Sequence, residues 1–292
     1  MALICLNFVN LWSSDLEHPA RFGFSSNYYL NSGLNCRQIE VTTSDGCLIK
    51  GWHHSPTHSE SGLLFIYLHG NAGNRGFPHR VELMKMLLRS VPSNVISFDY
   101  RGFGDSSCFP SQQGLVEDVK AIVSYGNQRG FKNDQIVLVG HSLGSGVALE
   151  AAKDISVKGI ILLGAYTSIE DAFFTYPLAK KLLPILLMPF LRDFISYLIS
   201  SSMNYKSIEN IKKLKTRLLL IHGKLDYDIP YEHSKALFEA KNEIYSSRDL
   251  PGFGALQMGQ STWFLSLFDA GHNNHHLYDI TGYIIKDFVQ ME

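Results

Sequence analysis

The chain has 292 residues, of which 45% are hydrophobic and 18% are charged, and its formal net charge is −1. This composition excludes a disordered or fibrous chain, and a chain of this length can bury a large core without a metal or disulfide framework. A nearly neutral chain also lacks the basic surface typical of nucleic-acid binding, so no nucleic-acid partner is expected. The four cysteines lie far apart with no CxxC pair, and we expect free buried thiols at Cys5, Cys36, Cys47 and Cys108.

Residues 1–35 form a predicted N-terminal extension. The apolar stretch near its start is too short to span a bilayer, and it has neither a preceding basic region nor a small-residue cleavage site. It is therefore a poor signal peptide. The segment from Arg37 to Pro56 then alternates apolar and polar residues around Asp45-Gly46, which predicts an antiparallel hairpin at a sheet edge.

From residue 63 onward, short apolar runs alternate with longer segments of helical period. This alternation is typical of βαβ units in a sheet that is covered on both sides. The sequence therefore predicts an α/β fold with a mostly parallel central sheet and helices on both faces. The expected strands after the hairpin are Leu63–His69, Asn94–Tyr100, Gln135–His141, Val157–Tyr166, Thr216–Gly223 and Thr262–His272.

The alternation stops between residues 170 and 215. Within this stretch Leu182–Ile199 is apolar and long enough to cross a bilayer, but Pro184 and Pro189 interrupt it and Arg192-Asp193 adds charge. Charge at that depth is costly, so we expect no transmembrane helix. We instead expect residues 170–215 to form a helical cap or lid, inserted between the two parts of one core, 36–169 and 216–292. The expected location is cytoplasmic or peripherally membrane-associated.

The pentapeptide Gly140-His141-Ser142-Leu143-Gly144 joins a predicted buried strand to a predicted helix. In a G-x-S-x-G turn the serine has a strained backbone, and the glycines let strand and helix approach closely. The serine hydroxyl then projects above the sheet. This context predicts that Ser142 is a nucleophile, whereas a serine that merely satisfies a turn is the alternative.

A serine hydroxyl needs a base and an orienting acid before it can attack a carbonyl. In this fold the acid and the histidine follow the serine in the chain. Asp226 and Asp228 come just after a buried strand, and we favour Asp226 because its loop leads to Ile229-Pro230. Asp228 stays an alternative, as does a capping or solvated carboxylate at either position.

The base is expected in the loop after the last strand, and His272 follows that strand directly. The nearby His275 and His276 already fall in a helical pattern. A rival interpretation groups His272, His275 and His276 with Asp279 as metal ligands, but no cysteine or glutamate completes such a site.

Acyl transfer also requires N–H donors for the oxyanion that forms on the carbonyl oxygen. The Leu143 N–H, at a helix start, is one predicted donor, and the N–H of Asn71, in a loop of small residues, is the other. His69 is expected to brace that loop. The loop from Asp99 to Ser106 is expected to run beside the site as a structural turn with an Arg–Asp tether.

These motifs resemble the α/β-hydrolases. The segments "YLHGNAGNRGFPHRVELMKML", "SFDYRGFGDSS" and "GHSLGSGVA" are similar to the membrane-associated monoacylglycerol and lysophosphatidylserine lipases of the α/β-hydrolase-domain group. The resemblance is strong from about residue 36 to 146 and looser beyond. It implies an α/β-hydrolase fold and no cofactor or metal. The matching positions are Ser142 as nucleophile, Asp226 as acid, His272 as base, and Asn71 and Leu143 as oxyanion donors.

The chain departs from those lipases in that we expect no membrane-spanning N-terminus. In addition, residues 268–272 read FDAGH, which is closer to the broader hydrolase set, and Pro251–Gln260 reads as an altered loop. These last two departures concern the head group of the substrate more than the chemistry.

The expected activity is hydrolysis of a single-chain fatty-acyl ester, either monoacylglycerol or lysophospholipid. The cap would contact lipid or line an acyl channel, which allows peripheral membrane contact; ordinary packing of the cap is the alternative. Cations that could meet a phosphate, or remain solvated, are Lys180, Lys181, Arg75 and Arg101. His53, His54 and His58 are expected at the surface. Rival functions are a protein-depalmitoylating thioesterase, a serine peptidase and, from another class, a non-catalytic scaffold.

Overall fold

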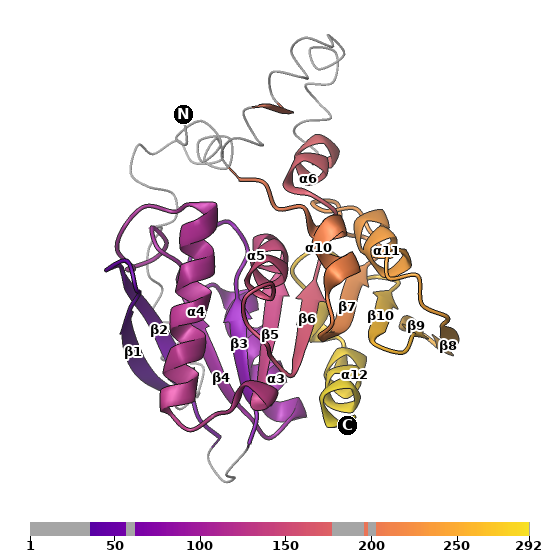
Figure 1. Cartoon of the computed structure of the whole chain (residues 1–292). Coiled ribbons are helices and arrows are strands. Elements are labelled where there is room, and N and C mark those ends of the chain that lie inside the picture. The colour runs from indigo at the N-terminus through magenta and orange to yellow at the C-terminus, as the bar shows by residue number, and fades with distance from the viewer. Residues whose placement is uncertain (1–35, 57–61, 177–195, 198–202, 292) are drawn as a thin grey trace.

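A computed structural model describes residues 36–56, 62–176, 196–197 and 203–291, and these contain one ten-stranded sheet (Figure 1). The strands follow the apolar runs of the sequence, and those in the middle of the sheet are almost completely buried. Their bounds are β1 Cys36–Thr42, β2 Leu48–His54, β3 Leu64–Leu68, β4 Asn94–Phe98, β5 Ile136–His141, β6 Gly159–Leu163, β7 Arg217–Gly223, β8 Ser246–Leu250, β9 Gly254–Met258 and β10 Thr262–Leu267.

The strand order is β1-β2-β4-β3-β5-β6-β7-β10-β9-β8. The six strands from β4 to β10 in this order are parallel, and each edge of the sheet is an antiparallel pair that continues it. The predicted mostly parallel α/β sheet is confirmed, and so is the N-terminal hairpin, in which Cys36 pairs with His54.

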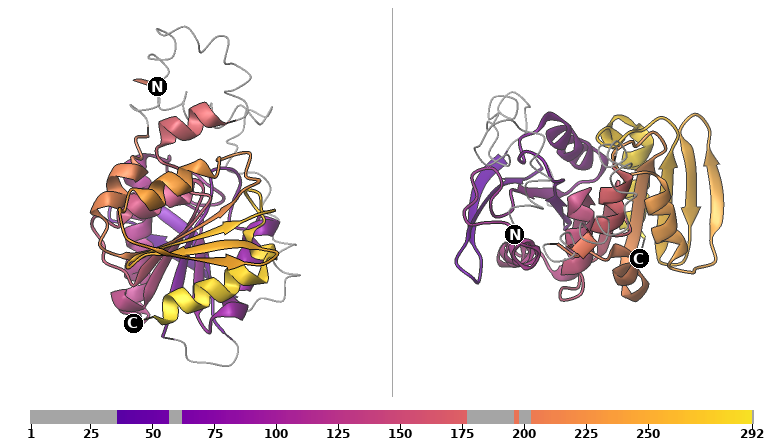
Figure 2. Two further views of the ribbon diagram at one scale, coloured as in Figure 1. Left: turned by 90° about the vertical axis from the view of Figure 1, so that its right-hand side faces the viewer. Right: turned by 90° about the horizontal axis from the view of Figure 1, so that it is seen from above.

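Helices cover both faces of the sheet, as the views from the side and from above show (Figure 2). Successive strand residues point to opposite faces, so Leu64, Ile66 and Leu68 belong to one core, whereas Phe65 and Tyr67 belong to the other. The first core is closed by α4 Gln112–Gln128, α5 Leu143–Ala151, α10 Ser207–Lys213 and α11 Glu232–Glu239, and the second by α3 Pro78–Ser90 and α12 Asp279–Gln290.

Local sequence explains where the helices begin. Ser111 caps α4 by accepting the Gly114 N–H at 3.0 Å, and Ser168 caps α6 (Ile169–Thr175) by accepting the Asp171 N–H. The helix α3 starts at Pro78, whose missing N–H costs nothing in the first turn. These starts fix the direction in which each helix leaves the carboxyl end of a strand.

The segment Pro251–Gln260 is not a loop, and that prediction was wrong. It contains β9, which pairs antiparallel with both β8 and β10. The glycines that suggested a loop serve the hairpin instead. Gly252 has φ = +79° in the turn, and a Cβ on Gly254 would overlap the carbonyl of Ser266 on the neighbouring strand.

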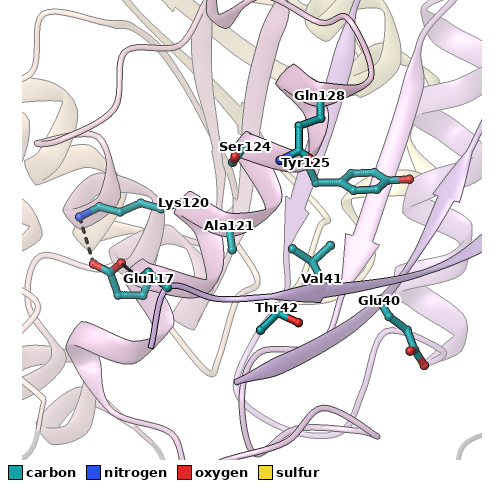
Figure 3. A pocket seen from close by; sticks show the side chains of 10 residues that line it. Glu40, Val41, Thr42, Glu117, Lys120, Ala121, Ser124, Tyr125 and Gln128 are labelled. Atoms are coloured by element: carbon teal, nitrogen blue, oxygen red, sulfur yellow. Dashed lines mark hydrogen bonds and ion pairs between the residues drawn. The ribbon is translucent and has the colours of Figure 1, made fainter. Parts of the chain in front are cut away.

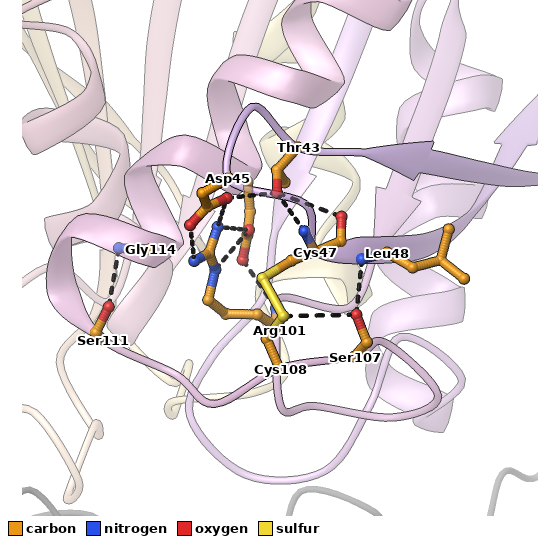
Figure 4. Close-up of a disulfide and its surroundings, with 10 residues drawn as sticks. Thr43, Asp45, Cys47, Leu48, Arg101, Ser107, Cys108, Ser111 and Gly114 are labelled. Atoms are coloured by element: carbon orange, nitrogen blue, oxygen red, sulfur yellow. Dashed lines mark hydrogen bonds and ion pairs between the residues drawn. A yellow bond between two sulfur atoms is a disulfide. The ribbon is translucent and has the colours of Figure 1, made fainter.

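The prediction of free thiols at Cys47 and Cys108 was also wrong, because these two residues form a disulfide (Figure 4). Their Cα atoms lie 5.8 Å apart although 61 positions separate them in the sequence. The pairing of β2 with β4 brings the start of one strand beside the loop that follows the other. The disulfide therefore ties the N-terminal hairpin to the loop after β4.

Several predictions fall on residues outside the described ranges: the extension 1–35, with Cys5; Lys180, Lys181 and His58; and all of Leu182–Ile199 except residues 196–197. Among the helices that the structure does describe, none has the length and apolar character needed to cross a bilayer. Of the predicted cap, Tyr205 and Ile211 are fully buried against the first core. The boundaries of the cap stay a prediction.

Candidate active site

The predicted site residues follow strands that end at the same side of the sheet. Ser142 comes directly after β5, Asp226 follows β7 by three residues, and His272 lies in the loop after β10. Asn71 lies in the loop after β3. Because β3, β5, β6, β7 and β10 are neighbouring parallel strands, their carboxyl ends form one edge (Figure 1). Open α/β sheets hold their sites outside this edge.

Ser142 has the strained backbone that a nucleophile at a sharp turn requires. Its φ is +52° and its ψ −117°, a conformation that non-glycine residues rarely adopt. Its N–H donates to the carbonyl of Leu163 at 3.0 Å, and its carbonyl accepts from the hydroxyl of Ser145 at 2.7 Å. These bonds hold the turn from both sides.

The two flanking glycines allow this turn because there is no room for side chains. A Cβ on Gly144 would overlap the carbonyl of Leu68, and a Cβ on Gly140 would overlap the carbonyl of Gly144. The helix α5 therefore lies directly on β3 and β5. As the first residue of α5, Leu143 has an N–H that is not used by a helical i→i−4 bond.

The structure brings Asp226 and His272 together, with Oδ2 of the carboxylate 2.7 Å from Nδ1 of the imidazole. The other carboxylate oxygen accepts the N–H groups of Asp228 at 3.0 Å and Ile229 at 2.8 Å. An ionised carboxylate can only accept, so Nδ1 of His272 donates its proton to it. In a neutral imidazole, Nε2 is then left to accept a proton.

His222 is a second histidine at the same carboxylate, and sequence reasoning missed it. Its Nε2 lies 3.2 Å from Asp226 Oδ2 and 2.9 Å from the carbonyl of Ile229. Burial opposes a charge on Asp226, but the contacts of His222 and His272 hold the pKa of this carboxyl well below its ordinary value. Asp226 is therefore ionised at neutral pH. The spacing of a histidine four residues before the acid was the available signal.

The residue before the serine connects the two parts of the site. The imidazole of His141 lies 4.8 Å from that of His272, centroid to centroid, and its Nε2 donates to the His272 carbonyl at 2.8 Å. Burial keeps the pKa of His141 well below its ordinary value, so this imidazole is neutral. His141 thus anchors the loop of His272 one residue away from Ser142.

The loop that carries Asn71 lies against Ser142, because a Cβ on Gly70 would come within 3.2 Å of the Ser142 Cβ. His69 is fully buried, and its Nδ1 donates to the Gly70 carbonyl at 2.7 Å, which is the bracing role that the sequence predicted. The hydroxyl of Tyr100 donates to the His69 carbonyl at 3.3 Å.

Arg75 and Arg101 are neither phosphate-binding nor solvated, so both interpretations of them were wrong. They are 3% and 4% exposed. Arg75 pairs with Asp99 and, at 2.6 Å, with Asp105. Arg101 pairs with Asp118 at 2.8 Å. It also pairs with Asp45 at 2.6 Å (Figure 4). The predicted structural turn with an Arg–Asp tether is confirmed by these pairs.

The remaining histidines also differ from expectation. His54 is fully buried in β2 rather than exposed, and His53 is half-buried, with Nε2 3.1 Å from the side-chain oxygen of Asn94. His275 is buried beside His141 in a short 3₁₀ turn. Within the described ranges no three histidine, cysteine or acidic side chains lie close enough to hold a metal ion.

A groove of about 410 Å³ lies away from this edge, between β1 and α4 (Figure 3). It is lined by Val41, Thr42, Tyr125 and an ion pair between Glu117 and Lys120, whose atoms are 3.1 Å apart. It contains none of the predicted site residues.

A parallel sheet with a serine on a strained strand–helix turn, and a histidine–aspartate pair from later strands, defines an α/β-hydrolase. Comparison with known proteins agrees: residues 64–194 match the family described as having the alpha/beta hydrolase fold. The chain is 33% identical to the lysophosphatidylserine lipase ABHD12 of Xenopus tropicalis over 274 residues, which cover 85% of this chain and 67% of that protein. The chain therefore belongs to the α/β-hydrolase family, in the branch that contains these lipases.

Two further similarities show how far this assignment to the family extends. The chain is 33% identical to human protein ABHD12B over 220 residues, which cover 74% of this chain but only 58% of that protein. The chain thus spans less than two thirds of that relative. An alpha-beta hydrolase from Vibrio vulnificus has the same fold, with a TM-score of 0.72 at 17% identity over 98% of this chain and 92% of that chain.

Proposed function

We propose that the protein is a serine hydrolase that cleaves the ester bond of single-chain fatty-acyl lipids, such as monoacylglycerol or lysophospholipid. The observation that carries the proposal is the strained backbone of Ser142, together with the hydrogen bond of 2.7 Å between Asp226 and His272, the predicted acid and base. A turn serine with no chemical role would not explain that backbone strain.

In the proposed first step, the Ser142 hydroxyl oxygen attacks the acyl carbonyl carbon while Nε2 of His272 takes the hydroxyl proton. The carbonyl electron pair moves to oxygen, and the N–H groups of Asn71 and Leu143 receive the resulting negative charge. Asp226 holds the Nδ1–H side of the imidazole and stabilises its charged form. His272 then gives the proton to the leaving alcohol oxygen, which leaves an acyl-enzyme.

Water completes the cycle by the same route. It loses a proton to His272 as its oxygen attacks the acyl carbonyl, and a second oxyanion forms at the same donors. The bond to the Ser142 oxygen then breaks, and the proton returns to that oxygen as the fatty acid leaves. No cofactor or metal takes part in this proposal, because the serine, base and acid together supply every proton transfer.

The substrate class rests on the relatives. The frog protein is named a lysophosphatidylserine lipase, and its likeness favours a lysophospholipid over other esters. Residues 170–215 are proposed as the cap, through which the protein would meet a membrane surface. The disulfide between Cys47 and Cys108 favours an oxidising compartment over the cytoplasm, where thiols are kept reduced.

The test uses a fluorophosphonate probe and four acyl substrates on the purified protein. Labelling is expected in the wild type and is expected to vanish in Ser142→Ala, whose kcat should fall about 10⁶-fold because the nucleophile is gone. The substrates are lysophosphatidylserine, a monoacylglycerol, a palmitoylated cysteine peptide and an unmodified peptide.

Each outcome decides between functions. Fastest turnover of either lipid supports the proposal, whereas preference for the palmitoylated or the unmodified peptide would replace it by a thioesterase or a peptidase. A wild-type protein that neither reacts with the probe nor cleaves any substrate would be a scaffold, and the proposal would be wrong.

A further inference from the structure

Arg80 is a buried cation beneath the loop that carries Asn71. It lies in the first turn of α3 and is 3% exposed. No described carboxylate forms an ion pair with it, and Asp99, the acid that acts on it electrostatically, is itself bound to Arg75. A buried charge without a paired opposite charge costs free energy, so its presence here calls for a role.

The guanidinium is held by backbone carbonyls. Nη1 donates to the carbonyl of Asn74 at 2.8 Å, and Nη2 donates to that of Gly70 at 3.1 Å and also to that of Ala72. The same group lies over the ring of Phe77, 5.1 Å from its centroid. Three of the five residues from 70 to 74 thus point their carbonyl oxygens at one positive charge.

This contact dictates where an N–H points. The carbonyl of Gly70 and the N–H of Asn71 belong to one planar trans peptide, in which the two bonds point in opposite directions. Both Arg80 and His69 bind this carbonyl oxygen. The Asn71 N–H is therefore directed away from the guanidinium, in a loop whose backbone at Gly70 touches Ser142.

A second consequence is electrostatic. A cation at the oxygen end of a peptide draws electron density from the N–H end, and hydrogen bonds arranged in a chain polarise one another. Arg80 is buried away from water, and Asp99, the carboxylate that acts on it, is already bound by Arg75. The field of Arg80 therefore reaches the region where the oxyanion of the proposed reaction forms.

We propose that Arg80 is a positioning residue of the oxyanion hole. It fixes the Asn71 N–H in the donating direction and strengthens that donor through the Gly70 peptide. The proposal rests on the proposed function, since it assigns Arg80 a part in stabilising the tetrahedral intermediate. Arg80 itself touches neither the substrate nor the reacting atoms.

The test compares three variants by rates, by affinities and by thermal unfolding. Arg80→Met removes the charge and its hydrogen bonds but keeps an unbranched apolar stem, whereas Arg80→Lys keeps the charge with fewer donors. Arg89→Met is the matched control, because Arg89 is an exposed arginine near the end of the same helix. The readouts are kcat and KM on one ester, the rate of labelling by a fluorophosphonate, and the affinity for an alkyl trifluoromethyl ketone against the unfluorinated ketone.

Arg80→Met is expected to lower kcat and the labelling rate about 100-fold, the size of losing one oxyanion donor, with KM changed by no more than about twofold. Binding of the trifluoromethyl ketone, which forms an oxyanion adduct with serine, should weaken by a similar factor, while binding of the plain ketone stays the same. Arg80→Lys should recover part of the loss, and Arg89→Met should equal the wild type.

Two results would overturn the inference while the proposed function stands. One is a folded Arg80→Met that keeps the wild-type labelling rate. The other is a loss that affects both ketones equally, because that pattern belongs to a deformed pocket. If Arg80→Met does not fold, Arg80→Lys decides: full kcat and full trifluoromethyl ketone affinity with a lowered melting temperature would mean a purely structural arginine. A wild type that is never labelled would refute both proposals.

Discussion

Arg101, in the loop after β4, and Arg80, beneath the loop after β3, are both buried arginines, but they are neutralised differently. After β4, Arg101 is bound by two carboxylates, those of Asp45 and Asp118. After β3, Arg80 is bound by three carbonyl oxygens and forms no ion pair with the described carboxylates. In the first arrangement the carboxylates neutralise the charge of the guanidinium, whereas in the second arrangement no described carboxylate is bound to it.

The two arginines therefore have different roles: Arg101 holds a loop in place, whereas Arg80 acts on a neighbouring peptide. A guanidinium paired with carboxylates has little field left beyond the pair, so the loop after β4 is suited to holding the hairpin in place, and the disulfide adds a covalent tie there. A guanidinium bound only by peptide dipoles keeps its field, and it lies under the loop that touches Ser142. Substitutions at Arg101 and its partners should therefore change stability, and substitution of Arg80 should change rate.

The largest expected effect on stability comes from the disulfide. Replacing Cys47 and Cys108 together by serine should lower the free energy of unfolding by about 4 kcal/mol, because a closed loop spanning 61 positions restricts the unfolded chain. Denaturant unfolding measures this change. Cys36→Ser leaves the disulfide intact and serves as the control. Equal midpoints for the double variant and the wild type would contradict the holding role.

The next effect concerns the ion pair. Asp118 is fully buried, and its carboxylate accepts the N–H and the Nε–H of Arg101, both at 2.8 Å. Asp118→Asn should lower the free energy of unfolding by about 3 kcal/mol, because it leaves a buried cation short of a partner. The kcat of the folded variant should equal that of the wild type. A fall in kcat without a fall in stability would erase the contrast between the two loops.

Acidification gives the smallest effect for each step of one pH unit. Burial lowers the pKa of His275 to about 3, whereas an unfolded histidine titrates near 6.5. The unfolded chain therefore binds more protons between these values, and stability is full above pH 6.5 and lost as the pH falls through this window. The expected slope is about 1.4 kcal/mol per pH unit for each such histidine.

Urea unfolding at pH 6, 5 and 4 measures how the free energy of unfolding changes with pH. In His275→Phe this slope should be smaller by the contribution of one histidine. Burial also lowers the pKa of His79, near the site, to about 3. An unchanged slope in His275→Phe would mean that this imidazole is not held neutral.

Much of the fold followed from the sequence because its signals are local. Apolar runs of strand length and helical periodicity depend on neighbouring residues, so the parallel sheet and the hairpin were predicted. The turn at Ser142 was equally legible, because the G-x-S-x-G spacing lies within five residues, although the atom that keeps Gly144 small is the carbonyl of Leu68 on β3. The pairing of Asp226 with His272 followed from the order in which this fold places them.

What the sequence concealed depends on contacts between distant segments. Cys47 and Cys108 meet only because β2 pairs with β4. Arg75 and Arg101 looked solvated because their partners come from other loops and from α4. The strand β9 was hidden by its glycines, which the neighbouring strand requires. Arg80 stood inside a quoted motif, but nothing local indicated that it would be buried without a carboxylate.

The ends of the sheet also bear on how copies of this chain meet. An edge strand offers unpaired backbone groups on which a second molecule can add a strand. Here β1 carries the exposed Arg37 and Glu40, and β8 carries the exposed Arg248 and Asp249. Extending the sheet from one molecule to the next would bring these charges together and strip their water, so the charges protect a long sheet from aggregation.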